Sequence, residues 1–559
     1  MKEKIRNVIN SRYFNSIFII ILNIIFFTIC NLLFNLHYET LDDFMIMKII
    51  SKLDGSYNVF SIHVHPFLSF IIMLLFKTGI NINWYTICLL TIQFTAFTVI
   101  EIILINKNKK IGFLSYIFIT STIYSDTLLI INYTSIASIS ILAGVISIMY
   151  YNDTNSKKYN IIGIGLIIIG TMLRWKSVII VIPFFAVYSI YYSIKEKNNK
   201  LIKKFIFTLG IIFVIVVSHL ITYKINTVYN NYTKFDNVRT YLFDFNILEY
   251  EKSKETFENS GWTENDWKVF YTYSFADENF YNVENLNTLK SNIENNAGTI
   301  INKILDTFNS LLLNINQYRI HFIGILILIL ISCILGSKKS IIFYIVLTHI
   351  LINYILCYTK PIYRVIISLY STTFVMILYL LSNKLNKHSK HNLINKIILI
   401  YTFLLYSMLN IIDTYQNNFY NIENYKVVRE IVDYTSSNKH NAYVYPNVLG
   451  NVSLAYSVYE KIPDDTFVNL RHMGDWDIYN QEYYEFKEIY QIDNIMEDLF
   501  KKDNIYIITG DVYGADNNKY INHIKNIQEY ISEHYDENVE YKVVKEFTDS
   551  IKVYKLYVN

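Results

Sequence analysis

The sequence predicts a mainly α-helical protein that crosses a membrane many times and carries a small C-terminal α/β domain. Of its 559 residues, 52% are hydrophobic and only 17% are charged. Apolar stretches long enough to cross a bilayer recur from residue 13 to about residue 413, and the alternating pattern of a soluble domain begins near residue 415. The net charge is +3, so composition gives no reason to expect a nucleic-acid partner.

The apolar stretches predict about eleven transmembrane helices. The first stretch follows a basic N-terminus and is longer than the core of a signal peptide, so we expect it to remain as a helix. The predicted spans are 13–35, 84–105, 111–128, 133–151, 161–173, 177–194, 205–222, 320–336, 340–358, 362–382 and 396–413.

A twelfth apolar stretch, residues 60–76, decides the topology. Cytoplasmic loops collect Lys and Arg. If this stretch does not cross the membrane, the basic N-terminus and the later basic loops all lie on one side. We therefore expect residues 60–76 to lie on the membrane surface or to re-enter it. The N-terminus is then cytoplasmic, and the C-terminal domain lies outside the cell membrane.

This topology divides the chain into a transmembrane domain, residues 1–414, and an extracytoplasmic domain, residues 415–559. Two outer loops, 37–83 and 223–318, belong to the first domain. Helices are expected in the second domain at 424–436, 481–501 and 519–536, and strands at 443–445, 505–509, 541–544 and 551–558. That order of elements predicts a small α/β fold.

Acidic side chains mark the outer face. Asp42 and Asp43 closely follow the first apolar stretch, where a carboxylate near lipid is costly and marks a polar site. Adjacent residues on a helix do not share a face, so we expect one of the two to point into a cavity and the other to cap or pair. Which one does so stays open. Asp126, between two apolar arms, is either a further site carboxylate or an interfacial turn residue.

Basic and histidine side chains lie on the same predicted face. Arg174 and Lys176 join two short spans, so their turn is expected below the outer surface, with interfacial snorkelling as the alternative. Lys360 and Arg364 add two further cations. His63 and His65 follow the acidic pair in the first outer loop, and their spacing favours polar packing over metal ligation.

Several features together resemble the GT-C superfamily of glycosyltransferases. They are the segment Glu39-Thr40-Leu41-Asp42-Asp43-Phe44 after the first span, a second acid between the third and fourth spans, about eleven spans and an outward C-terminal domain. The similarity is to the protein mannosyltransferase and aminoarabinose transferase type, which is glycosyltransferase family 39-like. Shorter segments resemble an uncharacterised bacterial multi-pass membrane family: Gly55, His63 to Pro66, Asn83 to Tyr85, Gly261 to Trp267, Asp277 and Gly474 to Trp476.

The resemblance implies an enzyme that transfers a sugar from a polyprenyl-phosphate donor to an extracytoplasmic glycan, polymer or protein by inverting displacement. Asp42 or Asp43 would be the base, and Asp126 would occupy the second acidic position. The donor phosphate would be held by cations, for which the candidates are Arg174, Lys176, Lys360 and Arg364, with His63 and His65 lining the site. A divalent metal, Mg²⁺ or Mn²⁺, stays open; if one binds, Asp43 and Asp126 are its expected ligands.

Three other functions remain open. A transporter or flippase for lipid-linked glycans would have broken helices in repeated halves, and no such repeat is evident. A polysaccharide polymerase or ligase would have a basic, histidine-rich outer loop, whereas residues 223–318 are mixed in charge. A sensor or scaffold would work through its C-terminal domain. The donor sugar, the acceptor and the linkage do not follow from the sequence.

Overall fold

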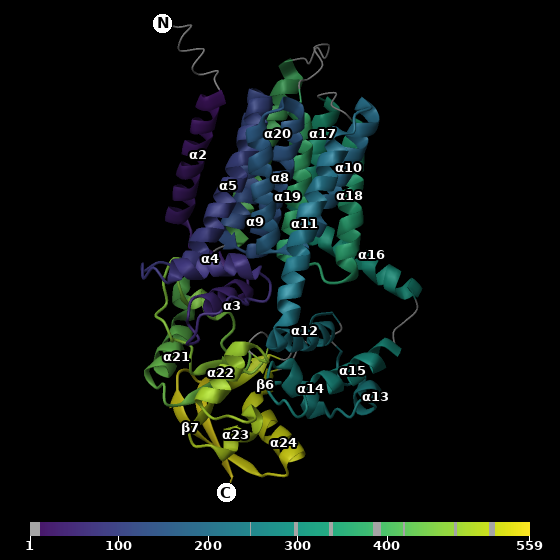
Figure 1. The fold of residues 1–559 in the computed structure, drawn as a ribbon. Coiled ribbons are helices and arrows are strands. Elements are labelled where there is room, and N and C mark those ends of the chain that lie inside the picture. Colours follow the sequence, from purple (N-terminus) through teal and green to yellow (C-terminus); the bar gives the residue numbers. More distant parts are fainter. Residues whose placement is uncertain are drawn as a thin grey trace.

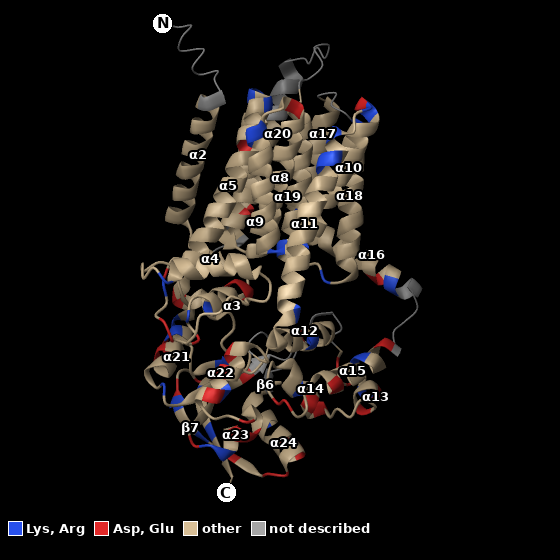
Figure 2. Cartoon of the chain, viewed as in Figure 1, with Lys and Arg blue, Asp and Glu red and all other residues tan. Residues whose placement is uncertain are grey.

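The computed structural model describes residues 12–245, 248–295, 300–334, 339–383, 393–417, 420–474, 478–513 and 520–558. Figure 1 shows two parts: a bundle of long helices, and a body of shorter helices and a sheet beyond one end of it. The first described helix, α2 (Arg12–Leu33), begins at the opposite end of the bundle, and the C-terminal strands lie in the outer body. In Figure 2 the charged residues crowd the outer body and the ends of the bundle, and the middle of the bundle is almost free of their colours.

Long apolar helices make the chain a multi-pass membrane protein. Among the described residues, seven helices are long and apolar enough to cross a bilayer. They are α2 (Arg12–Leu33), α5 (Trp84–Lys107), α8 (Tyr133–Thr154), α10 (Val178–Glu196, preceded by a short turn of helix), α11 (Lys200–Ile225), α18 (Lys339–Tyr358) and α19 (Tyr363–Leu381).

The remaining predicted spans are helical but do not meet that criterion. They correspond to α6 (Lys109–Ile119) with α7 (Ser125–Leu129), α9 (Lys157–Leu173), α17 (Arg319–Ile334) and α20 (Leu393–Asn417). A π-helical segment, Thr120–Tyr124, separates α6 from α7, and α17 is bent by 83° against α16 (Ile300–Gln317). The described residues thus contain seven spans, or eight if the bent pair counts as one, and not eleven. One reason is length: the 17 residues of α9 reach about 26 Å, less than the roughly 30 Å of a hydrocarbon core.

The ambiguous stretch 60–76 contains α4 (Pro66–Phe76), a helix of 11 residues. At about 17 Å it is too short to cross a bilayer, and Figure 1 shows it lying crosswise at the end of the bundle. Its exposed side chains are apolar: Phe67, Phe70, Ile71 and Leu74. These features fit a surface-lying helix, as the charge pattern predicts. The side of the membrane on which it lies stays a prediction.

The C-terminal region is built on a mixed sheet. Its strand order is β4-β3-β5-β8-β7, with β6 pairing to β5. The strands are β3 (Ala442–Tyr445), β4 (Leu470–His472), β5 (Ile505–Tyr513), β6 (Tyr520–Asn522), β7 (Val539–Glu546) and β8 (Ile551–Val558). β3 pairs in parallel with β4 and β5, whereas β8 pairs antiparallel with β5 and β7. The four predicted strands are present, and β4 and β6 are additions.

Helices accompany the sheet, and the loop 223–318 shares a core with them. They are α21 (Lys426–Ser437), α22 (Gln481–Ile489), α23 (Ile495–Lys501) and α24 (His523–Tyr535), so the predicted helix 481–501 is two helices. The loop forms α12 (Thr227–Thr240), α13 (Lys254–Glu258), α14 (Glu264–Tyr271) and α15 (Val283–Asn295) before α16. Buried side chains of the loop and of the C-terminal region belong to one hydrophobic cluster.

Two buried polar networks hold the outer body together and to the bundle. The carboxylate of Asp277, in the loop, accepts hydrogen bonds from the C-terminal residues Asn494, Tyr530 and Tyr535. In the first outer loop, Asp54 lies 3.2 Å from Lys48 and 3.6 Å from Arg471, and all three side chains are at most 2% exposed. The second network ties the first outer loop to β4.

Glu482 lies beside this second network, and its burial leads us to expect that the stability of the fold depends on pH. Burial, together with the charge of Asp54, raises the pKa of Glu482 from 4.5 to about 7. A raised carboxyl pKa stabilises the fold below pH 4.5, and this contribution is lost as the pH rises towards 7. The loss amounts to about 3 kcal/mol, since one pKa unit corresponds to about 1.4 kcal/mol. We therefore expect Glu482→Gln to raise the melting temperature at pH 8 more than at pH 5. Glu488→Gln, an exposed change on the same helix, is the control; equal pH profiles for wild type and Glu482→Gln would contradict this assignment.

Candidate functional site

A short strand pair places the acidic segment beside the fourth predicted span. β1 (His37–Tyr38) pairs in parallel with β2 (Ile130–Ile131), which lies between Asp126 and the start of α8. The N–H of Glu39 also donates to the carbonyl of Ile131 at 3.1 Å. The helix α3 (Leu41–Ile50), which carries Asp42 and Asp43, begins directly after this pair. The acids therefore lie at the end of the bundle that faces the outer body.

Asp43 is an internal anchor. Its side chain is fully buried, and its Oδ1 accepts hydrogen bonds from the Tyr85 hydroxyl at 2.9 Å and from the Tyr133 N–H at 3.0 Å. Its Oδ2 accepts from the amide of Asn132 at 3.2 Å. Asn132 and Tyr133 start α8, so the carboxylate satisfies a helix N-terminus. Burial raises the pKa of Asp43 well above its usual value, although the bonds from Tyr85 and Tyr133 oppose this.

Asp42 points to a different partner. Arg364, in the first turn of α19, donates to Asp42 Oδ2 at 2.8 Å and to Thr40 Oγ1 at 3.3 Å, and its guanidinium lies 3.7 Å from Glu39 Oε2. The side chains of Asp42 and Arg364 are 17% and 15% exposed. Burial raises the pKa of Glu39 to about 7, and Arg364 counteracts this. Of the two adjacent acids, Asp42 is the one that a ligand can reach.

A tyrosine connects this pair to the predicted cation turn. The ring of Tyr133 stacks on His63 at a centroid distance of 6.1 Å, and the guanidinium of Arg174 lies 5.3 Å from its centroid. The Tyr133 hydroxyl and Arg174 Nε are buried and have no hydrogen-bond partner among the described residues. Burial, with Arg174, Lys176 and Arg364 nearby, lowers the pKa of His63 well below its usual value, so its imidazole is neutral. We name Asp42, His63, Tyr133, Arg174 and Arg364 the outer polar cluster.

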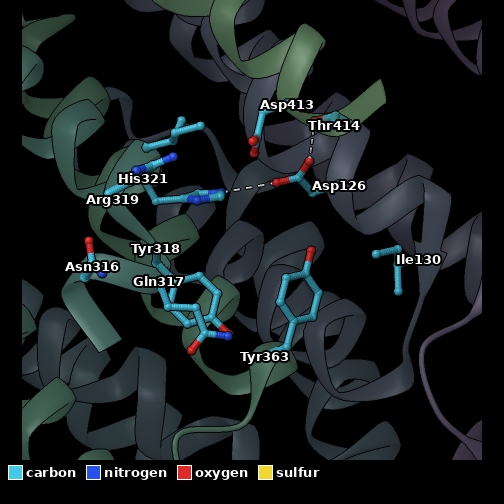
Figure 3. Close-up of a pocket in the computed structure, with 11 residues that line it drawn as sticks. Asp126, Ile130, Asn316, Gln317, Tyr318, Arg319, His321, Tyr363, Asp413 and Thr414 are labelled. Atoms are coloured by element: carbon cyan, nitrogen blue, oxygen red, sulfur yellow. Dashed lines mark hydrogen bonds and ion pairs between the residues drawn. The ribbon is translucent and has the colours of Figure 1, made fainter. Parts of the chain in front are cut away.

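Asp126 lies in a separate cavity of about 560 Å³. Its Oδ2 is 3.1 Å from His321 Nε2, and its Oδ1 accepts a hydrogen bond from Thr414 at 2.8 Å. Figure 3 shows the carboxylate of Asp413 next to that of Asp126, with the Tyr363 hydroxyl turned towards the same pair. The lining residues are Asp126, Ile130, Asn316, Gln317, Tyr318, Arg319, Ile320, His321, Tyr363, Asp413 and Thr414.

The cavity and the outer polar cluster adjoin at two consecutive residues. Tyr363 lines the cavity, and Arg364 holds Asp42. Glu39 and Asp126 both lie within electrostatic range of the Tyr363 hydroxyl. A ligand in the cavity would thus lie next to the cluster, within one outer polar region of the bundle.

The structure brings some predicted site residues together and separates others. Asp42, His63, Arg174 and Arg364 converge, and Lys176 is exposed beside Arg174. Lys360 is exposed in the connection between α18 and α19. His65 caps α4 by accepting from the Phe67 N–H at 3.2 Å, and its Nε2 is 3.0 Å from the Ser218 hydroxyl, so its contacts are those of polar packing.

Sequence reasoning missed Tyr133, His321, Asp413 and Thr414. His321 could have been found, because an ionisable side chain at the start of the apolar run 320–336 meets the same criterion as Asp42. Tyr133 carries no such signal. Its role depends on where His63 and Arg174 lie, and both are distant in sequence.

The expected metal ligands Asp43 and Asp126 do not form one site. Asp43 is absent from the lining of the Asp126 cavity, and both of its oxygens accept hydrogen bonds from the fold. Within the described ranges, the one cluster of three with ligand geometry is Asp266, Glu533 and His534 in the outer body. There Asp266 already accepts from the Thr263 N–H and contacts His534, so the capping of α14 explains it.

No family model matches the sequence, and a search of curated proteins finds no match. The likeness to GT-C glycosyltransferases therefore rests on its short motifs and stays a prediction. Of the shorter segments that resemble an uncharacterised bacterial multi-pass membrane family, Asp475 and Trp476 lie outside the described residues.

The contacts of the two adjacent acids predict different effects of truncation. Asp43→Ala leaves a buried tyrosine hydroxyl and the N-terminus of α8 without their acceptor, and we expect a loss of about 3 kcal/mol in unfolding free energy. Asp42→Ala removes a partly exposed pair and should cost about 1 kcal/mol or less. Thermal unfolding of both purified variants measures the difference. Equal losses would show that Asp43 is not the anchor.

Proposed function

We propose that the protein transfers a sugar from a polyprenyl-phosphate donor to an acceptor outside the cell, with inversion at the anomeric carbon. The observation that supports this most directly is the pairing of a reachable carboxylate, Asp42, with Arg364, near a Tyr133 ring that Arg174 contacts and whose hydroxyl has no hydrogen-bond partner among the described residues. Such a transfer needs an acid–base group and fixed positive charge at a polar region beside the membrane.

In this proposal the acceptor hydroxyl attacks the anomeric carbon of the donor sugar. The new bond joins the acceptor oxygen to that carbon, and the bond from the carbon to the phosphate oxygen breaks. The polyprenyl phosphate leaves with the electron pair, and the proton of the acceptor passes to Asp42. Arg364 orients the carboxylate of Asp42, since it donates to it at 2.8 Å.

The cations stabilise the leaving phosphate. Arg174 carries a buried Nε that has no hydrogen-bond partner within the described ranges, and Lys176 is exposed beside it, so both side chains can donate hydrogen bonds to phosphate oxygens. Lys360, exposed in the connection before α19, adds positive charge four residues ahead of Arg364. The neutral imidazole of His63, which stacks on Tyr133, adds an uncharged hydrogen-bonding group to the outer polar cluster.

The Asp126 cavity suits the acceptor. About 560 Å³ is within the range of small-molecule sites, and its lining combines carboxylates, amides, an imidazole and tyrosines that match sugar hydroxyls. Asp126, held by His321 and Thr414, is the second acid of this proposal. The GT-C fold, a cytoplasmic N-terminus and an outward region 415–559 belong to the same proposal.

The proposal predicts that Asp42→Asn nearly abolishes sugar transfer. General-base help contributes about 10² to 10⁴ in rate, and the amide cannot take the proton. Transfer is measured as label moving from the lipid fraction to water-soluble polymer in membranes that contain each variant. Glu423→Gln, an exposed acid in the outer region, is the matched control and should keep wild-type transfer. Full transfer by Asp42→Asn would remove Asp42 from the mechanism.

One observation favours transport as the second candidate. Asp126 and His321 form a buried acid–imidazole pair in the bundle, an arrangement that also serves proton relays in transporters. The two functions differ in their need for a sealed membrane. We expect transfer to continue in detergent, where a transporter has no second compartment. Activity confined to sealed vesicles, and lost in His321→Gln, would favour transport.

A further inference from the structure

An apolar groove lies between α9 and α11, on the outside of the bundle. It encloses about 460 Å³ and is lined by Ile168, Met172, Phe207, Gly210, Ile211, Val214 and Ile215. Phe207 and Val214 are 55% and 65% exposed, so the groove opens to the surroundings of the bundle. Every lining side chain is apolar or absent, so the groove suits a hydrocarbon chain.

The depth of the groove depends on Gly210. A Cβ placed at this position meets no atom within 4 Å, so the space above the backbone is open. Glycine is a poor helix former, and here it lies in the middle of α11. Gly165, in α9, has equally open space but does not line the groove. A larger side chain at Gly210 would therefore fill the groove, and the same substitution at Gly165 is a matched control outside it.

The groove ends at polar groups on the outer side. The carbonyl of Met172, a lining residue, accepts the His65 N–H at 2.8 Å, and Arg174 follows two residues later. On α11, Ser218 lies one turn beyond Ile215 and contacts His65 at 3.0 Å. The outer end of the groove therefore lies next to His65 and Arg174.

This end of the groove is positively charged. Lys176 is exposed there, Arg174 Nε is without a partner among the described residues, and both cations lie within electrostatic range of His219 on α11. Figure 2 shows blue ribbon beside α11, below the label of α9. Asp236 is the acid in range of Lys176, and Arg239 already holds it at 2.6 Å. The chemistry fits an anion attached to a hydrocarbon chain.

We propose that the groove between α9 and α11 binds the single hydrocarbon chain of a polyprenyl phosphate, with its phosphate at Arg174 and Lys176. This inference rests on the proposed function for the identity of the lipid as the sugar donor. It adds the place where the chain lies. The groove leads the phosphate to the outer polar cluster, because Arg174 contacts Tyr133.

The test measures binding of undecaprenyl phosphate to the purified full-length protein by native mass spectrometry. Gly210→Phe fills the groove, and we expect it to weaken binding about tenfold or more. Lys176→Gln removes one phosphate partner and should also weaken binding about tenfold. Gly165→Phe adds the same ring outside the groove and should bind like wild type.

Further arms identify the ligand. Undecaprenol, which lacks the phosphate, should bind more weakly than undecaprenyl phosphate, and phosphatidylglycerol should fail to displace the latter at equal concentration. Equal binding of undecaprenol, displacement by phosphatidylglycerol, or equal losses in Gly165→Phe and Gly210→Phe would overturn the inference. Thermal unfolding of both glycine variants, and of the smaller Gly210→Leu, separates a filled groove from a damaged fold.

The inference and the proposed function can fail separately. If Gly210→Phe keeps sugar transfer and lipid binding, the assignment of the groove as the lipid site is wrong, while the proposed transferase function still stands. If Asp42→Asn keeps transfer, the mechanism is wrong although the lipid measurement is unaffected.

Discussion

The buried carboxylate of Asp43 is the constraint on which the arrangement of the outer polar region depends. It joins three helices, because α3 carries it while Tyr85 of α5 and the first residues of α8 donate to it. A buried carboxylate is tolerated only when donors surround it. This requirement fixes the position of α3 on the bundle. The adjacent Asp42 then lies on another side of the helix, where Arg364 meets it.

The first outer loop is fixed at a second place, just after α3. Lys48, at the end of α3, pairs with Asp54, and Asp54 lies close to Arg471 of β4. Removing one partner of such a buried network leaves a charge without compensation, at a cost of about 3–5 kcal/mol. The loop is thus held by the bundle at Asp43 and by the outer body at Asp54. These two attachments fix the position of α3, and thereby the position of Asp42 relative to Arg364.

Hydropathy predicts where the helices lie, because apolar length is a local property of the chain. Each predicted range contains a helix, but the π-helical break at Thr120–Tyr124 and the bend before Arg319 are not visible in hydropathy. Part of the site was predictable for a similar reason: ionisable groups near lipid are rare, and this pointed to Asp42, Arg174 and Arg364. The partners of Asp126 were not predictable, since His321 and Thr414 are 195 and 288 residues away. Nor could sequence distinguish Asp42 from Asp43, because that difference depends on Tyr85 and Tyr133.

Burial determines the charge of the outer polar region. Burial raises the pKa of Glu39 to about 7, so this acid is only partly ionised at neutral pH, and burial also raises the pKa of Asp43 well above its usual value. The pKa of His63 is lowered, so it adds no positive charge. Asp42 therefore remains as the main counter-charge for Arg364, and Arg174 faces the ring of Tyr133 in place of a carboxylate. The region thus has more fixed cations than ionised acids, and it lies beside an apolar groove. Binding of a lipid phosphate there would be favoured by its negative charge and by burial of its hydrocarbon chain.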